Sequence, residues 1–277
     1  MLLASLVFSV VAITVKELKN IPVMEIIFFR SLVSVVLSFG HLQVKKVSIL
    51  GKPENRKTLG LRAVLGFLAL ATFFMTLQNM RLATAITVRY LTPIFTILVA
   101  AIFLKEKILK KQYLFFFISF AGVLIIKGFD KKVSLFYLGI GVLSSLFSGG
   151  GYSCIHKLKN ESPLVVIFYT AFFSLLASGL ILAFEWTTPT PLEWGMLLLV
   201  GVLTQAAQIF MTKAFQLENI AKVSSVTYVG LLYALGFGFF LFGEHFPNSS
   251  YVGMLVVLLG MLLNLFYKKI PKKFSQT

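Results

Sequence analysis

Two arginines inside long apolar stretches are the residues best suited to binding chemistry. Arg30 falls near the middle of the apolar run 22–40, and Arg89 lies about one and a half helical turns into the run 83–104. An arginine in hydrocarbon costs about 2.5–3.5 kcal/mol on insertion scales, so it needs a partner. Because guanidinium groups bind carboxylates and phosphates through charge-assisted hydrogen bonds, we predict that both arginines bind substrate.

Each arginine also has a structural interpretation. Arg30 could form an ion pair or bind carbonyls of a neighbouring helix, although Glu25 lies five residues away and points to a different helix face. Arg89 could instead extend to the outer membrane interface. Our hypothesis is that Arg89 faces a central cavity and binds a carboxylate or phosphate of the substrate.

The residues after Arg89 are also polar or helix-breaking: Tyr90, Thr92 and Pro93. Proline has no N–H, so Pro93 frees a carbonyl one turn earlier and makes polar backbone available inside the membrane. We predict that Tyr90 and Thr92 bind substrate and that Pro93 takes part in gating.

Two later apolar runs carry polar side chains that need partners in hydrocarbon: Gln205 and Gln208, and then Thr227 and Tyr228. Such residues either join helices or line a cavity, and joining helices is the commoner role for threonine. A glutamine offers two donors and one acceptor, which suits a ligand. We include all four among the predicted substrate-binding residues.

Glu106 and Glu244 stand at the ends of two apolar runs. An acid at a helix C-terminus opposes the helix dipole and needs nearby cations or water. Lys107, Lys110 and His245 are close enough in sequence to offset the charges. A structural role and a role in gating or proton coupling both remain open for the two glutamates.

The sequence predicts no catalytic residue, metal site or cofactor. Cys154 is the single cysteine, which excludes an internal disulfide and a cysteine-based metal cluster. The chain contains no Walker A glycine loop and no HExxH pair. These absences argue against a pump that hydrolyses ATP within one chain.

The composition is that of a membrane protein. Of the 277 residues, 58% are hydrophobic and 13% are charged, and the mean hydropathy is +0.90. A soluble domain carries about 25% charged residues and could not hide so much apolar surface. The net charge of +16 comes from lysines and arginines between apolar runs, so it indicates membrane topology rather than a nucleic-acid partner.

A helix needs about 20 apolar residues to cross the hydrocarbon. Ten runs approach that length, and we expect the first to be a retained helix rather than a signal peptide. The predicted spans are 1–17, 22–40, 61–80, 83–104, 112–127, 134–156, 163–184, 192–213, 220–242 and 249–267.

The first five spans resemble the second five. Phe8-Ser9 matches Phe147-Ser148, and Phe74-Met75-Thr76 matches Phe210-Met211-Thr212. The common order and spacing indicate an internal repeat, which divides the chain into 1–130 and 131–277, the second unit ending in a short basic tail.

An odd number of spans per unit inserts the second unit in the opposite sense, and the loop charges agree. The loop after 22–40 carries six basic residues, and the loop after 163–184 carries none. The six are Lys45, Lys46, Lys52, Arg56, Lys57 and Arg62. The positive-inside rule therefore places both termini in the cytoplasm of a multi-pass cell-membrane protein. The expected fold is an all-α integral membrane protein with ten transmembrane helices in two inverted five-helix repeats.

Several segments resemble EamA-type members of the drug/metabolite transporter superfamily. They are Leu82–Ile86, Tyr90–Phe95, Phe103–Lys107, Glu25–Arg30 with Ser31, and Met211–Phe215. The resemblance covers nearly the whole chain and implies the fold and a transport role, without naming a substrate. The second unit departs from the first with Leu231 in place of Pro93 and Thr170 in place of Arg30, so we expect an asymmetric site.

Inverted repeats are a recurring architecture of secondary transporters. We predict a transporter that moves a small organic metabolite, anionic or zwitterionic, across the lipid bilayer by alternating access, as a monomer or homodimer. The alternatives are a membrane-embedded enzyme acting on lipid-linked substrates and a non-transporting accessory subunit. Direction and ion coupling remain open.

Overall fold

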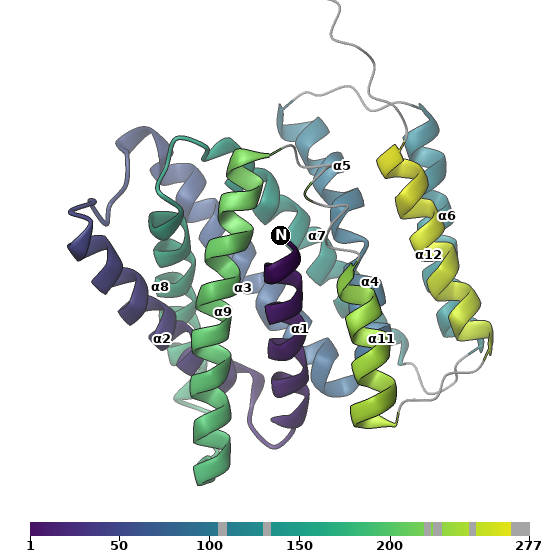
Figure 1. Cartoon of the computed structure of the whole chain (residues 1–277), viewed down its shortest axis with the longest axis horizontal. Coiled ribbons are helices and arrows are strands. Elements are labelled where there is room, and N and C mark those ends of the chain that lie inside the picture. The colour runs from purple at the N-terminus through teal and green to yellow at the C-terminus, as the bar shows by residue number, and fades with distance from the viewer. Residues whose placement is uncertain (105–109, 130–133, 219–222, 224–228, 244–247, 267–277) are drawn as a thin grey trace, which may run out of the picture.

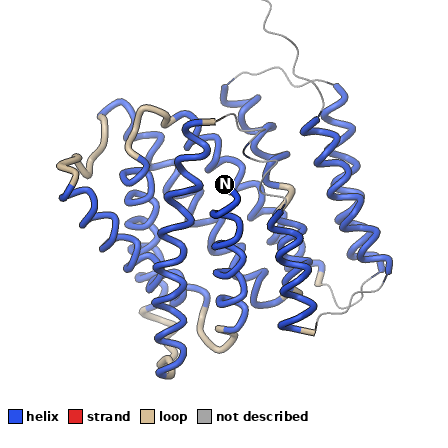
Figure 2. Tube along the Cα trace, in the orientation of Figure 1, coloured by secondary structure: helices blue, strands red, loops and turns tan. Residues whose placement is uncertain are grey.

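The computed structural model describes residues 1–104, 110–129, 134–218, 223, 229–243 and 248–266, and every regular element within these ranges is a helix (Figures 1 and 2). The elements of the first half are α1 (Leu2–Glu17), α2 (Val23–Val44), the 3-10 turn η1 (Pro53–Asn55), α3 (Arg56–Asn79), α4 (Leu82–Arg89), α5 (Thr92–Leu104) and α6 (Lys110–Phe129). Those of the second half are α7 (Leu135–Lys157), α8 (Pro163–Leu182), α9 (Pro191–Leu217), α11 (Val229–Phe242) and α12 (Asn248–Phe266).

Five stretches of the described chain are long and apolar enough to cross a membrane: α2, η1 with α3, α7, α8 and α9. Their side chains are distributed as lipid requires. On α8, Leu176 and Leu180 are exposed, whereas Ser174 and Ser178 are fully buried. Apolar residues of α8 therefore cover the outside of the bundle, and its small polar residues face the interior.

The helices pack in matching pairs across the two halves. Helix α1 contacts α9 and α7 contacts α3, while α2 contacts α9 and α8 contacts α3. Two further pairs, α2 with α8 and α6 with α12, join corresponding helices directly, and α6 and α12 lie side by side in Figure 1. Exchanging the halves therefore leaves this pattern of contacts unchanged.

One hydrogen-bonding arrangement occurs once in each half. The amide of Gln78, at the end of α3, donates to the carbonyls of Leu18 and Ile21 at 2.8 and 2.9 Å. The amide of Gln216, at the end of α9, donates to the carbonyls of Leu158 and Glu161 at 2.9 and 3.0 Å. Each glutamine therefore fastens the end of its helix to the turn that joins two preceding helices, α1 and α2 in the first half and α7 and α8 in the second.

The predicted span 83–104 is broken, which corrects the expectation of one continuous helix. Helix α4 ends at Arg89, and α5 begins at Thr92 after two turn residues. Pro93 cannot donate to the carbonyl of Arg89, and the Thr92 hydroxyl donates to that oxygen instead at 2.6 Å. A side chain therefore satisfies the backbone group that the proline frees.

Helix α7 holds both pieces of the broken span in place. Ser145 donates to the carbonyl of Val88 in α4 at 2.9 Å, and Ser153 donates to the carbonyl of Thr96 in α5 at 3.3 Å. A Cβ atom on Gly149 would lie 2.7 Å from the backbone nitrogen of Thr96, so only glycine permits this close approach. The position of Arg89 is thus set by packing between the two halves.

Arg62 requires a second correction, because we counted it among the charges of the loop after 22–40. It lies inside α3, where only 5% of its surface is exposed. Of the other five, Lys45, Lys46 and Lys52 lie between α2 and α3, and Arg56 and Lys57 are exposed in the first turn of α3. The contrast with the loop after α8 remains, and one of the six charges becomes a candidate for function.

Candidate substrate-binding cavity

A cavity of about 1320 Å³, the space at its mouth included, lies among the helices of both halves. Its wall includes Met1 to Ala12 of α1, Arg62 to Phe74 of α3, the second half of α7 and Thr204 to Phe215 of α9. Helices α1 and α3 begin, and α7 and α9 end, around one apolar cluster that contains Ala4, Leu59, Ile155 and Phe215. The cavity therefore extends from the middle of the bundle toward the side on which the N-terminus lies (Figure 1).

On the opposite side of the bundle, the described residues form a larger apolar core. Leu77 and Met80 at the end of α3 pack there with Leu82 at the start of α4 and Leu197 near the start of α9. Phe73 and Phe74 belong both to this core and to the cavity wall, so they form the inner end of the cavity.

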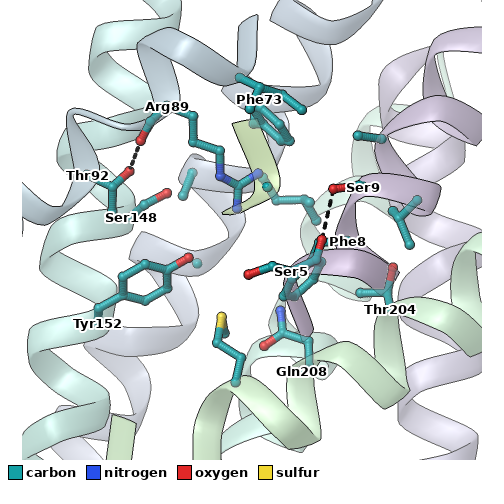
Figure 3. A pocket seen from close by; sticks show the side chains of 18 of the residues that line it. Ser5, Phe8, Ser9, Phe73, Arg89, Thr92, Ser148, Tyr152, Thr204 and Gln208 are labelled. Atoms are coloured by element: carbon teal, nitrogen blue, oxygen red, sulfur yellow. Dashed lines mark hydrogen bonds between the residues drawn. The ribbon is translucent and has the colours of Figure 1, made fainter. Parts of the chain in front are cut away.

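Arg89 points into the cavity from the last turn of α4 (Figure 3). The central carbon of its guanidinium lies 3.8 Å from the centroid of the Phe73 ring. This cation–π contact fixes the group against one wall and leaves its N–H donors for another partner. The arrangement corresponds to the cavity-facing hypothesis for Arg89 rather than to the interface one.

Arg30 of α2 and Arg62 of α3 also line the cavity, although each is only 5% exposed. The Nε atom of each is buried without a hydrogen-bond partner in the described part of the chain. The charges of Arg62 and Arg89 both act on Arg30, so each of these two guanidinium groups lies within electrostatic range of Arg30. Repulsion of this kind is unfavourable in a medium of low dielectric constant.

No Asp or Glu is among the described residues that line the cavity. Glu25, the acid nearest to Arg30 in sequence, instead accepts a hydrogen bond from the backbone N–H of Thr187 at 3.1 Å. Three cations therefore share one cavity without a described carboxylate to neutralise them. Buried charges in proteins are normally paired, so the arrangement favours an anionic ligand.

Neutral polar groups complete the cavity. Thr92 and Ser148 line it near Arg89, and Gln208 and Thr204 line it from α9, as Figure 3 shows. Tyr152 of α7 also lines it and stacks on Phe215, with ring centroids 4.6 Å apart. These side chains offer hydrogen bonds and an aromatic face to an organic substrate.

The other predicted site residues are placed differently. Tyr90 and Pro93 line the cavity, but Gln205 does not. The Gln205 amide donates to the hydroxyl of Ser38 in α2 at 2.8 Å and so joins two helices. The remaining four predicted residues lie outside the described residues: Glu106, Thr227, Tyr228 and Glu244.

Arg62 and Tyr152 are absent from the residues predicted from sequence. The available signal for Arg62 was its place at the start of the run 61–80, together with a glycine one turn later at Gly66. Tyr152 directly follows a run of three glycines at 149–151, which shows only that helices approach closely there. Neither signal indicates cavity lining by itself.

In the described part of the chain, no group of three or more His, Cys, Asp or Glu is arranged to hold a metal ion. The described residues of the cavity offer guanidinium, hydroxyl, amide and aromatic groups to an organic molecule.

Comparison with known proteins decides the family. The model of the EamA-like transporter family matches residues 1–128 and again residues 135–266. The chain belongs to the EamA-like transporter family. The resemblance noted in the sequence is thereby confirmed, and with the apolar helices it establishes a multi-pass membrane protein of a transporter family.

Named relatives of this EamA-family chain include transporters of bacteria and mammals. The chain is 31% identical over 269 residues to the pseudopaline exporter CntI of Pseudomonas aeruginosa (strain UCBPP-PA14), covering 95% of this chain and 93% of the exporter. It is 28% identical over 260 residues to solute carrier family 35 member G1 of Homo sapiens, covering 88% and 71% of the two chains. A crystal structure of a protein that is 14% identical superposes with a TM-score of 0.70 over 94% of this chain and 93% of the other, and so shares its fold.

Proposed function

We propose that this EamA-family protein is a secondary transporter that moves a small organic anion or zwitterion across the cell membrane by alternating access. The observation that carries the proposal is the presence of three arginines in one cavity whose described lining contains no acid. A substrate carboxylate or phosphate supplies the missing partner, and guanidinium groups bind both through paired hydrogen bonds.

Alternating access rests on an architecture of ten helices in two inverted repeats, 1–130 and 131–277. The matching helix contacts, the equivalent bonds of Gln78 and Gln216, and the twofold match to the family model all support such a repeat. Related halves that exchange conformations open a central site to one side of the membrane and then to the other.

The basic loops support a cytoplasmic location for both termini. The loop after α2 carries Lys45, Lys46 and Lys52, whereas the loop after α8 carries none. With this orientation, the cavity extends toward the cytoplasm, as an inward-facing state requires. The name of the Pseudomonas relative supports export as the direction of transport.

Within the cavity, Arg89 would bind the anionic group while Phe73 holds the guanidinium in place. The break between α4 and α5, with Tyr90 and Pro93 beside the substrate, would let this segment move during the exchange of conformations. Gln208 and Thr92 would bind other polar groups of the substrate.

The proposal is tested with the purified protein in proteoliposomes, by measuring uptake of radiolabelled organic anions and of cationic controls. Arg89→Gln should lower anion uptake about tenfold to a hundredfold, because a hydrogen bond to a charged group contributes about 1.5–3 kcal/mol. Lys213→Gln is the matched control, since Lys213 is an exposed cation of α9 that lies outside the cavity wall. Unchanged anion uptake by Arg89→Gln, or preference of the unmodified protein for cations, would refute the proposal.

A further inference from the structure

Arg62 occupies a place that the helices leave open for a guanidinium group. A Cβ atom on Gly66 would collide with Nη1 of Arg62, and one on Gly151 of α7 would lie 3.4 Å from the same nitrogen. The Cβ on Gly66 would also lie 2.7 Å from Cγ2 of Thr170 in α8. The guanidinium therefore lies over Gly66, between α7 and α8, and glycine is the residue that admits it.

The position of Arg62 relates to the difference between the two halves. Thr170 is the second-half counterpart of Arg30, and it leaves α8 without a charge of its own. Arg62 reaches that part of the cavity from α3. The second-half side of the cavity thus also receives a guanidinium group, through a side chain of the first half.

The guanidinium groups of Arg62 and Arg89 lie at different depths in the cavity. The Arg62 guanidinium is level with Gly66, and the Arg89 guanidinium lies on the ring of Phe73. These two positions on α3 are separated by about 10 Å of helix rise.

From this geometry we infer that the cavity has two anion subsites, one at Arg62 and one at Arg89, and that its preferred substrates carry two anionic groups, as dicarboxylates do. A monoanion would leave at least two of the three guanidinium charges uncompensated, which is costly where the dielectric constant is low. A dianion neutralises one charge at each depth. The inference rests on the proposed function, because it specifies the substrate class of the same cavity.

The experiment compares two six-carbon probes, adipate with two carboxylates and hexanoate with one. Binding to the purified full-length protein is measured by thermal stabilisation over a range of probe concentrations, since a ligand of the folded state raises the unfolding temperature. The unmodified protein should bind adipate at least tenfold more tightly than hexanoate. Arg62→Gln should weaken adipate binding at least tenfold and change hexanoate binding less than twofold.

Two further variants separate the subsite from a structural role of Arg62. Gly66→Ala keeps the arginine but displaces its guanidinium, so it should cause the same selective loss of adipate binding. Arg62→Lys keeps the charge and should retain part of the preference for adipate. If Arg62→Gln does not fold, these two variants decide the question.

The possible failures are distinguishable. Equal binding of adipate and hexanoate by the unmodified protein, or equal weakening of both by Arg62→Gln or Gly66→Ala, would overturn the two-subsite inference while anion binding at Arg89 stands. Absence of binding of both probes, together with anion uptake that Arg89→Gln leaves unchanged, would overturn the proposed function as well.

Discussion

The two halves of the chain share their scaffold and differ in their charges. Gln78 and Gln216 make equivalent hydrogen bonds in the two halves, and α1–α9 contacts mirror α7–α3 contacts. All three cavity arginines nevertheless come from the first half: Arg30, Arg62 and Arg89. The described second-half residues that line the cavity are uncharged: Ser148, Tyr152, Thr170, Thr204, Gln208, Met211, Phe215 and Gly230.

This difference separates the residues that maintain the scaffold of the bundle from the residues that would bind a substrate. In both halves, a glutamine donates to two carbonyls of the turn between two helices and so holds the scaffold together. A substrate does not have to share the symmetry of the scaffold, so nothing requires its partners to be repeated. Thr170 is the counterpart of Arg30, and Met211, five residues before Gln216, is the counterpart of Phe73, five residues before Gln78; at these places the second half lacks the charge or the aromatic face.

The largest expected effect is a loss of stability in Thr170→Arg, which gives the second half the arginine that the first half carries at Arg30. Thr170→Arg places a further cation beside Arg62, whose guanidinium already occupies the space near Gly66. An unpaired buried charge of this kind should destabilise the fold by about 3–5 kcal/mol. The measurement is the fraction of monodisperse protein and its unfolding temperature in detergent.

The double variant Thr170→Arg with Arg62→Leu tests the reason for that loss. Removing Arg62 vacates the space and the competing charge, so the double variant should recover most of the stability. Loss of stability that the second substitution does not relieve would show that the shape of the new side chain, rather than charge repulsion, is responsible.

An intermediate loss of stability is expected from removing the glutamine hydrogen bonds that the two halves share. Gln78→Leu and Gln216→Leu each remove an amide that donates to two carbonyls, and each should lower the free energy of unfolding by about 1–3 kcal/mol. The measurement is an SDS titration in mixed micelles. Asn79→Leu is the control, because the exposed Asn79 bonds only to a carbonyl of its own helix.

Because the two arrangements are equivalent, Gln78→Leu and Gln216→Leu should lower the free energy of unfolding by similar amounts. The loss in Gln216→Leu should be equal or greater, because Gln216 is the more deeply buried. A large loss in one half and none in the other would contradict the equivalence of the two arrangements. It would also argue against an inverted repeat whose two halves exchange conformations.

Apolar length and charged loops were sufficient to predict most of the described helices. For example, the run 134–156 coincides closely with α7, which spans Leu135–Lys157. The break at Tyr90 was not predictable, since a proline can also kink a helix that continues. The break depends on α7 holding α4 and α5 separately through Ser145 and Ser153.

The residues that line the cavity were predictable only in part, because the sequence does not specify which face of each helix points into the cavity. Gln205 and Gln208 look equivalent in sequence, yet Gln205 bonds to Ser38 of another helix and only Gln208 lines the cavity. Arg62 was assigned to a loop because it stands at the edge of an apolar run. Its burial depends on distant contributions from Gly151 and Thr170.

The smallest expected effect concerns the aromatic face that only the first half provides. Phe73→Leu removes the cation–π contact with Arg89, which contributes about 0.5–2 kcal/mol depending on how far the pair is removed from water. Anion affinity should therefore fall by about twofold to thirtyfold, with less loss than in Arg89→Gln. Binding of adipate and hexanoate is measured by thermal stabilisation, as for the Arg62 variants.

The control for this variant is Phe240→Leu, the same substitution at a phenylalanine that is 82% exposed on the outside of α11. Because Phe73 orients Arg89 rather than Arg62, its loss should weaken both probes by a similar factor. Arg62→Gln should weaken the binding of adipate alone. The ratio of the adipate and hexanoate affinities therefore distinguishes Phe73, which orients the Arg89 guanidinium, from Arg62, which supplies the second guanidinium. A loss confined to adipate in Phe73→Leu would show that the Arg89 end of the cavity does not bind the carboxylate common to both probes, and the assignment of the two depths would then be wrong.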